Sequence, residues 1–312
     1  MKASLRAAVQ HYLKTRRLLG FTLAKEGVEL QGLVRYAASR HHTGPLTAQL
    51  AIDWAQQPRQ ADRLYWASRL DIARRFAVFW IAYDPRTEIP PRGLFGPTFR
   101  RRAVHVYTTQ QIGALLAATA EVGRIHPLCA HTLRTLLGLL ACTGMRIGEA
   151  LGLADSDLDW GTGVLTIRHA KYGHARLVPL APCALAALHR YQSARHKALG
   201  SGKAPRFFVN LYGRALGYKP VSRIFRRLTR QVGWTQTPVP RLHDLRHTFA
   251  VRTLLHWYEG GEPIEPKLWT LSTYLGHVDL HSTQCYLTLT PELLAEANRL
   301  FQNWVYGACH EE

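Results

Sequence analysis

Basic side chains in the second half of the chain stand at spacings that can hold an anion. His243 and Arg246 are three residues apart, and such positions share one face of a helix. Their imidazole and guanidinium groups can therefore address one anion together. Arg146 follows a Thr–Gly pair and stands three residues before Glu149, whose carboxylate can hold the guanidinium. Taken alone, the second pair is more typical of an ion pair on a helix surface, but together the two pairs indicate a phosphate site.

The same region also offers a spacing that occurs in zinc sites. His243 and His247 are four residues apart, as are paired zinc ligands on one helix. In such sites a glutamate directly follows the first histidine and a third ligand stands farther along. No glutamate follows His243, and no cysteine or carboxylate stands at a convincing distance for a third ligand. The pattern favours a phosphate site over a metal site, and we expect no metal ion and no other cofactor.

A tyrosine that could act as a nucleophile comes later in the chain. Tyr286 stands nine residues after His277, which ends a Leu–Gly–His segment. A phenol with a pKa of about 10 is a poor nucleophile, so it needs a group that helps to remove its proton. Cys285 is the neighbouring alternative, but adjacent side chains point in different directions and no base is placed for a thiol. Tyr286 is favoured over Cys285 for this role.

In chain order, these segments resemble the signature of the tyrosine recombinase (phage integrase) family. That signature has an arginine in a TGxRxxE turn, a lysine on a β-hairpin, an HxxR helix, an LGH segment and a tyrosine nine residues later. The chain supplies Thr143–Gly144–Met145–Arg146–Ile147–Gly148–Glu149, Lys171, His243–Asp244–Leu245–Arg246, Leu275–Gly276–His277 and Tyr286. The resemblance covers residue 107 to the C-terminus. It implies a site-specific DNA recombinase or integrase that serves a mobile genetic element.

The resemblance also implies how charge on the reacting phosphate is stabilised. Cleavage of a phosphodiester builds negative charge on the non-bridging oxygens in a five-coordinate transition state. Arg146 and Arg246 would clamp those oxygens with charges that stay fixed at physiological pH. His277 would donate a further hydrogen bond to them. Glu149 would support Arg146.

The remaining roles implied by the resemblance concern the covalent step. Tyr286 would attack the phosphate, and His243 would assist the transfer of its proton. Lys171 would protonate the departing 5′ oxygen. The product is a 3′-phosphotyrosyl bond with a free 5′ hydroxyl, a linkage that keeps the energy of the phosphodiester. Religation then needs neither ATP nor a metal.

The charge balance of the whole chain indicates an anionic partner. The 312 residues include 40 Lys and Arg against 21 Asp and Glu, which gives a formal net charge of +19. An excess of this kind is typical of proteins that bind nucleic acids or anionic membranes. The most apolar run, 136–142, is too short to span a membrane, and the basic N-terminus lacks the apolar region of a secretory signal. We therefore expect double-stranded DNA as the partner, and we expect no binding to a membrane.

The five cysteines and the compositional breaks indicate where the protein resides and how it is divided. The cysteines form no CxxC motif and are typical of reduced thiols in a cytoplasmic protein. Proline, glycine and arginine are concentrated in 85–106, which is the composition of a linker. We therefore expect a first domain over 1–84, the basic linker over 85–106 and a catalytic domain over 107–312.

The first domain reads as helical throughout. Apolar residues recur at helical spacing, with further helices expected over 47–55 and 61–83. In the last of these, Arg69 is expected to lie mostly away from the apolar stripe. A DNA-binding module, equivalent to the family's core-binding domain, and a solvated helical bundle fit this segment about equally. The expected DNA contacts from the first domain and the linker are Arg74, Arg75, Arg100, Arg101 and Arg102.

The catalytic domain is expected to combine helices with a small antiparallel β-sheet, so the fold class is mainly α. A β-hairpin is expected from residue 163 to 180, with Lys171 at its tip. The stretch between Arg246 and His277 is longer than in compact family members, and its residues 258–263 read as a surface loop. A final helix over 291–306 carries an apolar stripe that must dock. It docks either on its own domain or, as the resemblance implies, on a neighbouring protomer. In the second case the protein forms a dimer on one DNA site and a tetramer in the synapse.

Two other functional classes share features with this pattern. A type IB topoisomerase or a telomere resolvase uses the same set of residues but does not exchange DNA partners. A DNA-binding protein that has lost catalysis is the other alternative, although every catalytic position is filled here. The spacing from the Leu–Gly–His segment to Tyr286 and the chain length favour a recombinase.

Overall fold

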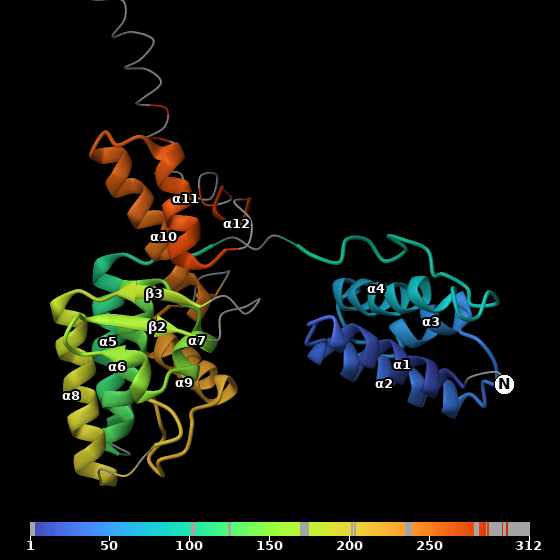
Figure 1. The fold of residues 1–312 in the computed structure, drawn as a ribbon, viewed down its shortest axis with the longest axis horizontal. Coiled ribbons are helices and arrows are strands. Elements are labelled where there is room, and N and C mark those ends of the chain that lie inside the picture. Colours follow the sequence, from blue (N-terminus) through green and yellow to red (C-terminus); the bar gives the residue numbers. More distant parts are fainter. Residues whose placement is uncertain are drawn as a thin grey trace, which may run out of the picture. The chain divides into compact units, whose positions relative to one another are not determined.

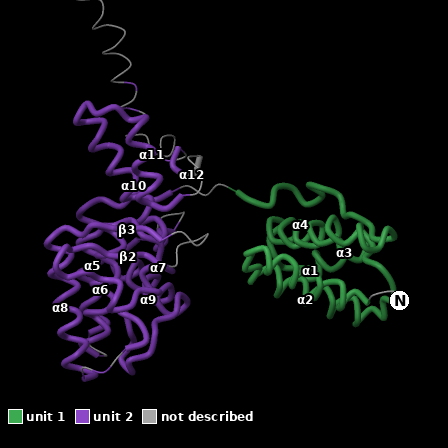
Figure 2. The backbone as a smooth tube through the Cα atoms, viewed as in Figure 1, with its two compact units in different colours: residues 1–102 green, residues 103–312 purple. Residues whose placement is uncertain are grey.

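The computed structural model describes residues 4–100, 104–123, 126–168, 175–200, 202, 204–234, 239–277, 281–284, 286, 295 and 298. It divides into two compact units, Met1–Arg102 and Ala103–Glu312 (Figure 2). Each unit has a hydrophobic core of its own. The two are therefore described separately.

The first unit is a helical bundle (Figure 1). Its helices are α1 (Leu5–Leu18), α2 (Ala24–Ser39), α3 (Ala48–Gln56) and α4 (Arg63–Trp80). Ser4, Thr47 and Asp62 cap α1, α3 and α4, because their side-chain oxygens accept hydrogen bonds from free backbone N–H groups of the first turn. Trp54 and Phe76 lie in a core to which every one of these helices contributes. The helical periodicity of the sequence is thus confirmed.

Two features of the first unit differ from the sequence-based expectation. Arg69 is buried, with its guanidinium carbon 4.1 Å from the centre of the Trp54 ring, so the outward placement expected for it was wrong. The first half of the expected linker, 85–106, also packs against the first unit. Phe95 is buried in the core of the first unit, and the backbone carbonyl of Pro90 accepts a 2.6 Å hydrogen bond from Arg74. Burial of an apolar ring is favourable, and the chain allows Phe95 to reach the core.

The second unit contains helices around a small sheet. Its elements are α5 (Thr109–Gly123), α6 (Pro127–Thr143), α7 (Ile147–Gly152), η1 (Asp155–Asp157), β1 (Leu158–Asp159), β2 (Val164–Ile167), β3 (Arg176–Pro179), α8 (Pro182–Leu199), α9 (Tyr218–Gln231), α10 (Leu242–Glu259), α11 (Ile264–Leu275) and α12 (His281–Gln284). The larger core surrounds α6, whose leucines are buried on several sides. A smaller core joins α10 and α11 and includes Tyr286.

The sheet confirms the expected hairpin and adds a short strand. In the described residues the strand order is β1-β2-β3, and both pairs are antiparallel. Leu165 lies opposite Val178, and Ile167 lies opposite Arg176. Leu165, Ile167 and Val178 face the core, while Leu177 is exposed, as the alternation along a half-buried strand requires. The mainly α fold class with a small antiparallel sheet is therefore confirmed.

Several expectations fall at the edges of the described residues. Lys171 lies outside them, as does the helix expected over 291–306, apart from Ala295 and Asn298. The segment 258–263 is shorter as a loop than expected, because α10 continues to Glu259 and α11 begins at Ile264. Among the described residues, no helix has the length and hydropathy needed to cross a membrane.

Candidate active site

The turn that carries Arg146 is shaped by the end of α6. Gly144 ends this helix with a left-handed backbone, φ +61°. The Thr143 hydroxyl donates to the carbonyl of Leu139 at 2.6 Å, and buried Met145 fixes the chain that follows. Arg146 is then the residue that precedes α7, so its guanidinium projects from the start of a helix. The turn is therefore determined by the left-handed backbone of the glycine and by the burial of the methionine.

We expect Gly144→Ala to destabilise the protein by about 2 kcal/mol or more, because two effects add. A left-handed backbone disfavours alanine, and the added methyl group would overpack a filled space. Its Cβ would lie 2.5 Å from Cδ1 of Phe249. Urea unfolding measures the change. Gly138→Ala on the same helix is the control, since a Cβ there meets nothing within 4 Å. Equal stability of the two variants would contradict the packing described here.

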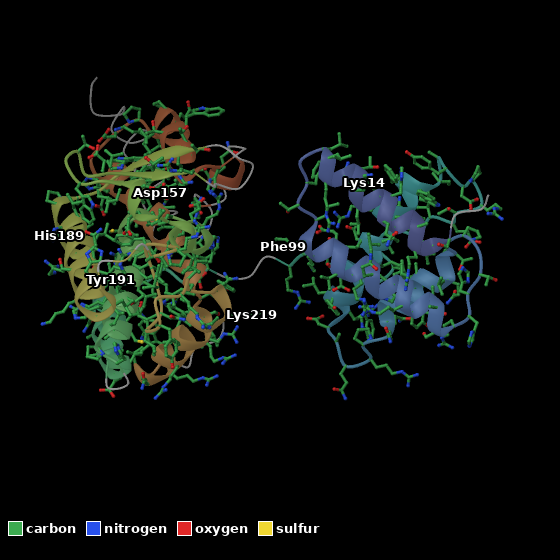
Figure 3. All side chains as sticks on the ribbon, turned by 60° about the horizontal axis from the view of Figure 1, so that its bottom comes forward. Lys14, Phe99, Asp157, His189, Tyr191 and Lys219 are labelled. Atoms are coloured by element: carbon green, nitrogen blue, oxygen red, sulfur yellow. The ribbon has the colours of Figure 1, made fainter. Side chains whose placement is uncertain are left out.

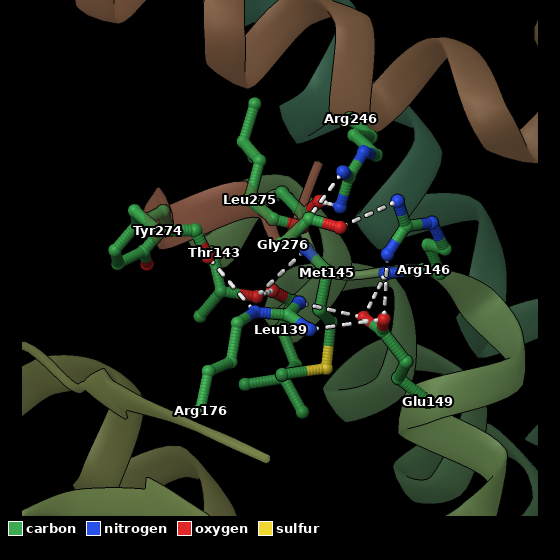
Figure 4. A network of polar contacts seen from close by, with 11 residues as sticks. Leu139, Thr143, Met145, Arg146, Glu149, Arg176, Arg246, Tyr274, Leu275 and Gly276 are labelled. Atoms are coloured by element: carbon green, nitrogen blue, oxygen red, sulfur yellow. Dashed lines mark hydrogen bonds and ion pairs between the residues drawn. The ribbon is translucent and has the colours of Figure 1, made fainter. Parts of the chain in front are cut away.

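Glu149 connects two arginines of the site, because its carboxylate binds both. Its Oε1 accepts from Nη1 of Arg146 at 2.9 Å, and its Oε2 accepts from the Arg146 backbone N–H at 2.8 Å. Arg176 on β3 donates to both carboxylate oxygens, at 3.0 and 2.7 Å (Figure 4). The side chain of Glu149 is only 3% exposed. The hairpin is thereby tied to the Arg146 turn through one buried carboxylate.

The electrostatic balance keeps Glu149 ionised. Burial alone would raise its pKa, but the hydrogen bonds and positive charge of Arg176, with the bonds from Arg146, outweigh this and lower it. Arg176 also donates from Nε to the carbonyl of Tyr274 at 2.8 Å. Every polar group of Arg176 is thus used within the protein fold, so it serves to position its neighbours.

We expect Glu149→Gln to lower the free energy of unfolding by about 3 kcal/mol, because it leaves two partly buried guanidinium groups without a counter-charge. Since the folded-state pKa of Glu149 lies below its ordinary value of 4.5, its ionised form stabilises the fold at higher pH. This contribution is lost as pH falls through the folded-state pKa. Urea unfolding between pH 7 and pH 3 tests both statements, with Glu259→Gln at an exposed position as the control. A variant whose stability follows the wild type at every pH would contradict them.

Arg246 lies under the Arg146 turn and is buried, with 2% exposure. Its Nη1 donates to the carbonyl of Gly144 at 2.9 Å, and its Nη2 donates to the carbonyl of Leu275 at 2.8 Å. Nη2 of Arg146 donates to the next carbonyl, Gly276, at 3.0 Å (Figure 4). The two guanidinium groups are therefore held side by side by the ends of α6 and α11, although they are 100 residues apart in sequence.

The charges of the two arginines influence each other. Burial and the positive charge of Arg146 lower the pKa of Arg246 to about 10, while the phenolate form of Tyr286 would raise it. Arg246 stays protonated at neutral pH.

The start of α10 places His243 at the surface above Arg246. Arg241 precedes the helix, and the Asp244 carboxylate accepts hydrogen bonds from its backbone N–H at 2.7 Å and its Nη2 at 2.9 Å. This bond network fixes the first turn of α10. His243 is solvent-accessible, yet desolvation by the surrounding protein and the charge of Arg246 lower its pKa. A neutral imidazole at pH 7 can accept a proton.

Tyr286 lies near His247, one turn along α10 from His243, and His277 lies near Tyr286. The Tyr286 ring is 2% exposed, and its centre lies 5.5 Å from the His247 ring and 6.2 Å from the His277 ring. His277 shares a 2.7 Å hydrogen bond with the hydroxyl of Thr283, with the donor set by the tautomer. These distances place Tyr286 on the α10 side of the site.

His247 is a neighbour of Tyr286 that the sequence reading treated only as a possible zinc ligand. Burial and the nearby His243 lower its pKa to about 3, so it is neutral at pH 7. Its ring centre lies 4.6 Å from that of His243. Among the described residues, no group of three or more histidine, cysteine or acidic side chains is arranged to hold a metal ion.

The expected DNA-contacting residues of the first unit are differently placed. Arg74 donates to a backbone carbonyl of its own unit, and Arg75 forms ion pairs with Asp71 at 3.1 Å and Glu26 at 3.8 Å. Arg100 is exposed, while residues 101 and 102 lie outside the described part of the chain. The structure thus brings Arg146, Glu149 and Arg246 together, with Tyr286 close enough to Arg246 for an electrostatic interaction. From the sequence, Arg176 stands out only as a basic neighbour of Lys171 on the hairpin, as does Arg168, and its contact with Glu149 was not predicted.

Comparison with known proteins places the second unit in a family. The model of the phage integrase family matches residues 105–292. "Putative integrase/recombinase y4rB" of Sinorhizobium fredii (strain NBRC 101917 / NGR234) is 40% identical, and the match spans 97% of this chain and 98% of that protein. "Tyrosine recombinase XerC" of Chlamydia caviae is 28% identical over 72% of this chain and 67% of its own length.

Solved structures show the same fold. The Tn1549 transposon integrase in complex with transposon right end DNA has a TM-score of 0.65 at 19% identity, and the match covers 94% of this chain and 99% of that one. A lambda integrase tetramer bound to a Holliday junction has a TM-score of 0.61 at 18% identity, with 89% and 78% covered. With a family model that matches more than half of its residues, the chain belongs to the phage integrase family, the tyrosine-type site-specific DNA recombinases.

Proposed function

We propose that Tyr286 cleaves DNA by attacking a backbone phosphate held between Arg146 and Arg246. The observation that carries this proposal is the pair of guanidinium groups fixed by the backbone carbonyls of Gly144, Leu275 and Gly276 beside the tyrosine. Two fixed positive charges match the charge that develops on the non-bridging oxygens, and they need no rearrangement during the reaction. His277 adds a donor for the same oxygens.

The covalent step can be written with all bonds accounted for. The Tyr286 oxygen forms a bond to phosphorus, the bond from phosphorus to the 5′ oxygen breaks, and the 5′ oxygen takes up a proton. His243, neutral at pH 7, assists removal of the phenol proton, and Lys171 supplies the proton to the leaving oxygen. The reverse attack by a 5′ hydroxyl of another strand completes strand exchange without an external energy source.

We further propose that the substrates are paired recombination sites of a mobile genetic element. The resemblance to a transposon integrase supports this. The experiment incubates the protein with plasmids carrying the DNA that flanks its own gene and sequences the junctions that form. We expect exchange at one short repeated sequence. Efficient relaxation of any supercoiled plasmid, without junctions, would favour the type IB topoisomerase activity instead.

The basic surface of α9 supports duplex DNA as the partner. This helix has no acidic residue, and its exposed side chains include Lys219, Arg223, Arg226, Arg227 and Arg230. Figure 3 shows Lys219 at the surface of the second unit. A row of exposed cations along one helix can neutralise several phosphates and release their counterions.

We also propose that protomers form a dimer on one site and a tetramer in the synapse, linked by the apolar segment 291–306. The lambda integrase tetramer on a Holliday junction supports this assembly for a related fold. Sedimentation of the protein with site DNA tests it, using Leu300→Asp to disrupt the apolar stripe. We expect the variant to bind DNA as a monomer. Docking within one protomer would instead lower thermal stability and leave the stoichiometry unchanged.

A further inference from the structure

A pocket of about 460 Å³ opens on the first unit and is lined by residues of α2, α3 and α4. Trp54 and Arg69 contribute buried side chains to its lining, with 0% and 6% exposure. Glu29 and Tyr65 also line it, and exposed Arg35 stands at its edge. None of these residues belongs to the active site.

Two hydrogen-bond donors of this pocket are buried without an acceptor. Within the described part of the chain, Nε1 of Trp54 and Nε of Arg69 have no hydrogen-bond partner. Arg69 Nε lies 3.6 Å from Glu29, which is too long for a hydrogen bond. The Glu29 carboxylate already accepts from the Tyr65 hydroxyl at 2.9 Å. Buried donors in proteins are nearly always satisfied, so these two indicate a group that the pocket receives.

Gly32 keeps the space before these donors open. It lies in the interior of α2, where glycine is a poor helix former. A Cβ at this position would lie 3.6 Å from Nε1 of Trp54 and 3.9 Å from Nη2 of Arg35. The indole N–H and the Arg35 guanidinium therefore border the same small volume, which any larger residue would partly fill.

The chemistry of the pocket selects an oxyanion. The groups that lack partners are donors, and Arg35 and Arg69 carry two positive charges against the single negative charge of Glu29. A ligand must therefore bring acceptor oxygens with negative charge, and phosphate is the group that guanidinium binds in this way. We propose that this pocket seats a backbone phosphate of bound DNA, held by Trp54, Arg69 and Arg35. The proposal rests on the proposed function, because it takes DNA as the partner.

The partners of the arginines in the first unit also agree with this assignment. Arg74 and Arg75 are engaged within their own unit, whereas Arg35 forms no ion pair or hydrogen bond among the described residues. Phosphate contacts position a protein on the duplex without reading its sequence. The pocket would thus fix where the first unit binds the DNA backbone.

Gly32→Ala in the full-length protein separates ligand binding from charge and stability. The methyl group fits at ordinary contact distances and removes no donor and no charge. We expect the thermal midpoint to stay the same or rise, while affinity for a duplex of about 30 base pairs at low salt falls about tenfold. Gly113→Ala on α5 is the matched control, since a Cβ there meets nothing within 4 Å. Wild-type affinity of Gly32→Ala would overturn the proposal.

Nuclear magnetic resonance of the tryptophan indole N–H groups identifies the ligand. Trp54→Phe assigns the Trp54 signal, and the duplex or inorganic phosphate is then added to the wild type. We expect the duplex to shift this signal and Gly32→Ala to abolish the shift. A shift with inorganic phosphate alone would overturn the DNA assignment, and no shift with either probe would overturn the site. A covalent adduct at Tyr286 without a Trp54 response refutes only this inference, while a Trp54 response without an adduct refutes only the proposed active site.

Discussion

Tyr286→Phe is expected to abolish the covalent protein–DNA adduct that the wild-type protein forms on a nicked duplex containing its recombination site. The substitution removes one oxygen atom, and without this oxygen no bond to phosphorus can form. The arginine pair is untouched, so DNA binding should persist. The adduct is measured by its slower migration in a denaturing gel, and binding by gel retardation under native conditions.

The control for this experiment is Tyr258→Phe, a half-buried tyrosine near the end of α10. It removes the same oxygen from the same unit and should leave adduct formation unchanged. Thermal unfolding of both variants excludes misfolding as the reason for a loss, because Tyr286 is itself buried. An adduct that survives in Tyr286→Phe would show that another residue is the nucleophile.

Arg246→Lys is expected to lower the rate of cleavage by about 100- to 1000-fold, as the removal of a preorganised donor for developing charge does in other enzymes. Lysine keeps the positive charge, but its three N–H groups radiate from one nitrogen. Arg246 uses separate nitrogens for the Gly144 and Leu275 carbonyls, and one nitrogen cannot take the place of both while it also binds a phosphate oxygen. Single-turnover cleavage with saturating protein separates this effect from DNA affinity.

Arg252→Lys provides the matched control on the same helix. Arg252 donates from Nη2 to the carbonyl of Tyr107 at 2.9 Å and does not contact the other arginines of the site. We expect its cleavage rate to stay within a few-fold of the wild type, since only one hydrogen bond is changed. If Arg246→Lys instead cleaves normally but binds DNA poorly, Arg246 positions the DNA backbone and does not stabilise the transition state.

Local spacing predicted the parts of the site that depend on one turn of helix. Arg146 and Glu149 are three residues apart, and they form the expected ion pair because the turn after Gly144 brings such positions together. Gly144 itself was recognisable as the end of a helix. The alternation of apolar residues likewise predicted the hairpin, since one face of β2 and β3 had to reach the core.

Contacts between distant segments were beyond the reach of the sequence. Arg176 binds Glu149 only because the hairpin register and the end of α11 place it there, 27 residues from its partner. Arg69 was expected to lie mostly away from the apolar stripe because of its position along the helix. The ring of Trp54 and the carboxylate of Glu29 make its burial tolerable, and no periodicity reports such partners.

Mapping the residue that carries the DNA tests the central claim most directly. The protein is trapped on a nicked duplex, digested with protease and nuclease, and the nucleotide-bearing peptide is sequenced by mass spectrometry. We expect a phosphotyrosyl bond at Tyr286 to the 3′ end of the cleaved strand, with a free 5′ hydroxyl on the other fragment. A nucleotide on any other residue, or a linkage to the 5′ end, would contradict the proposed mechanism.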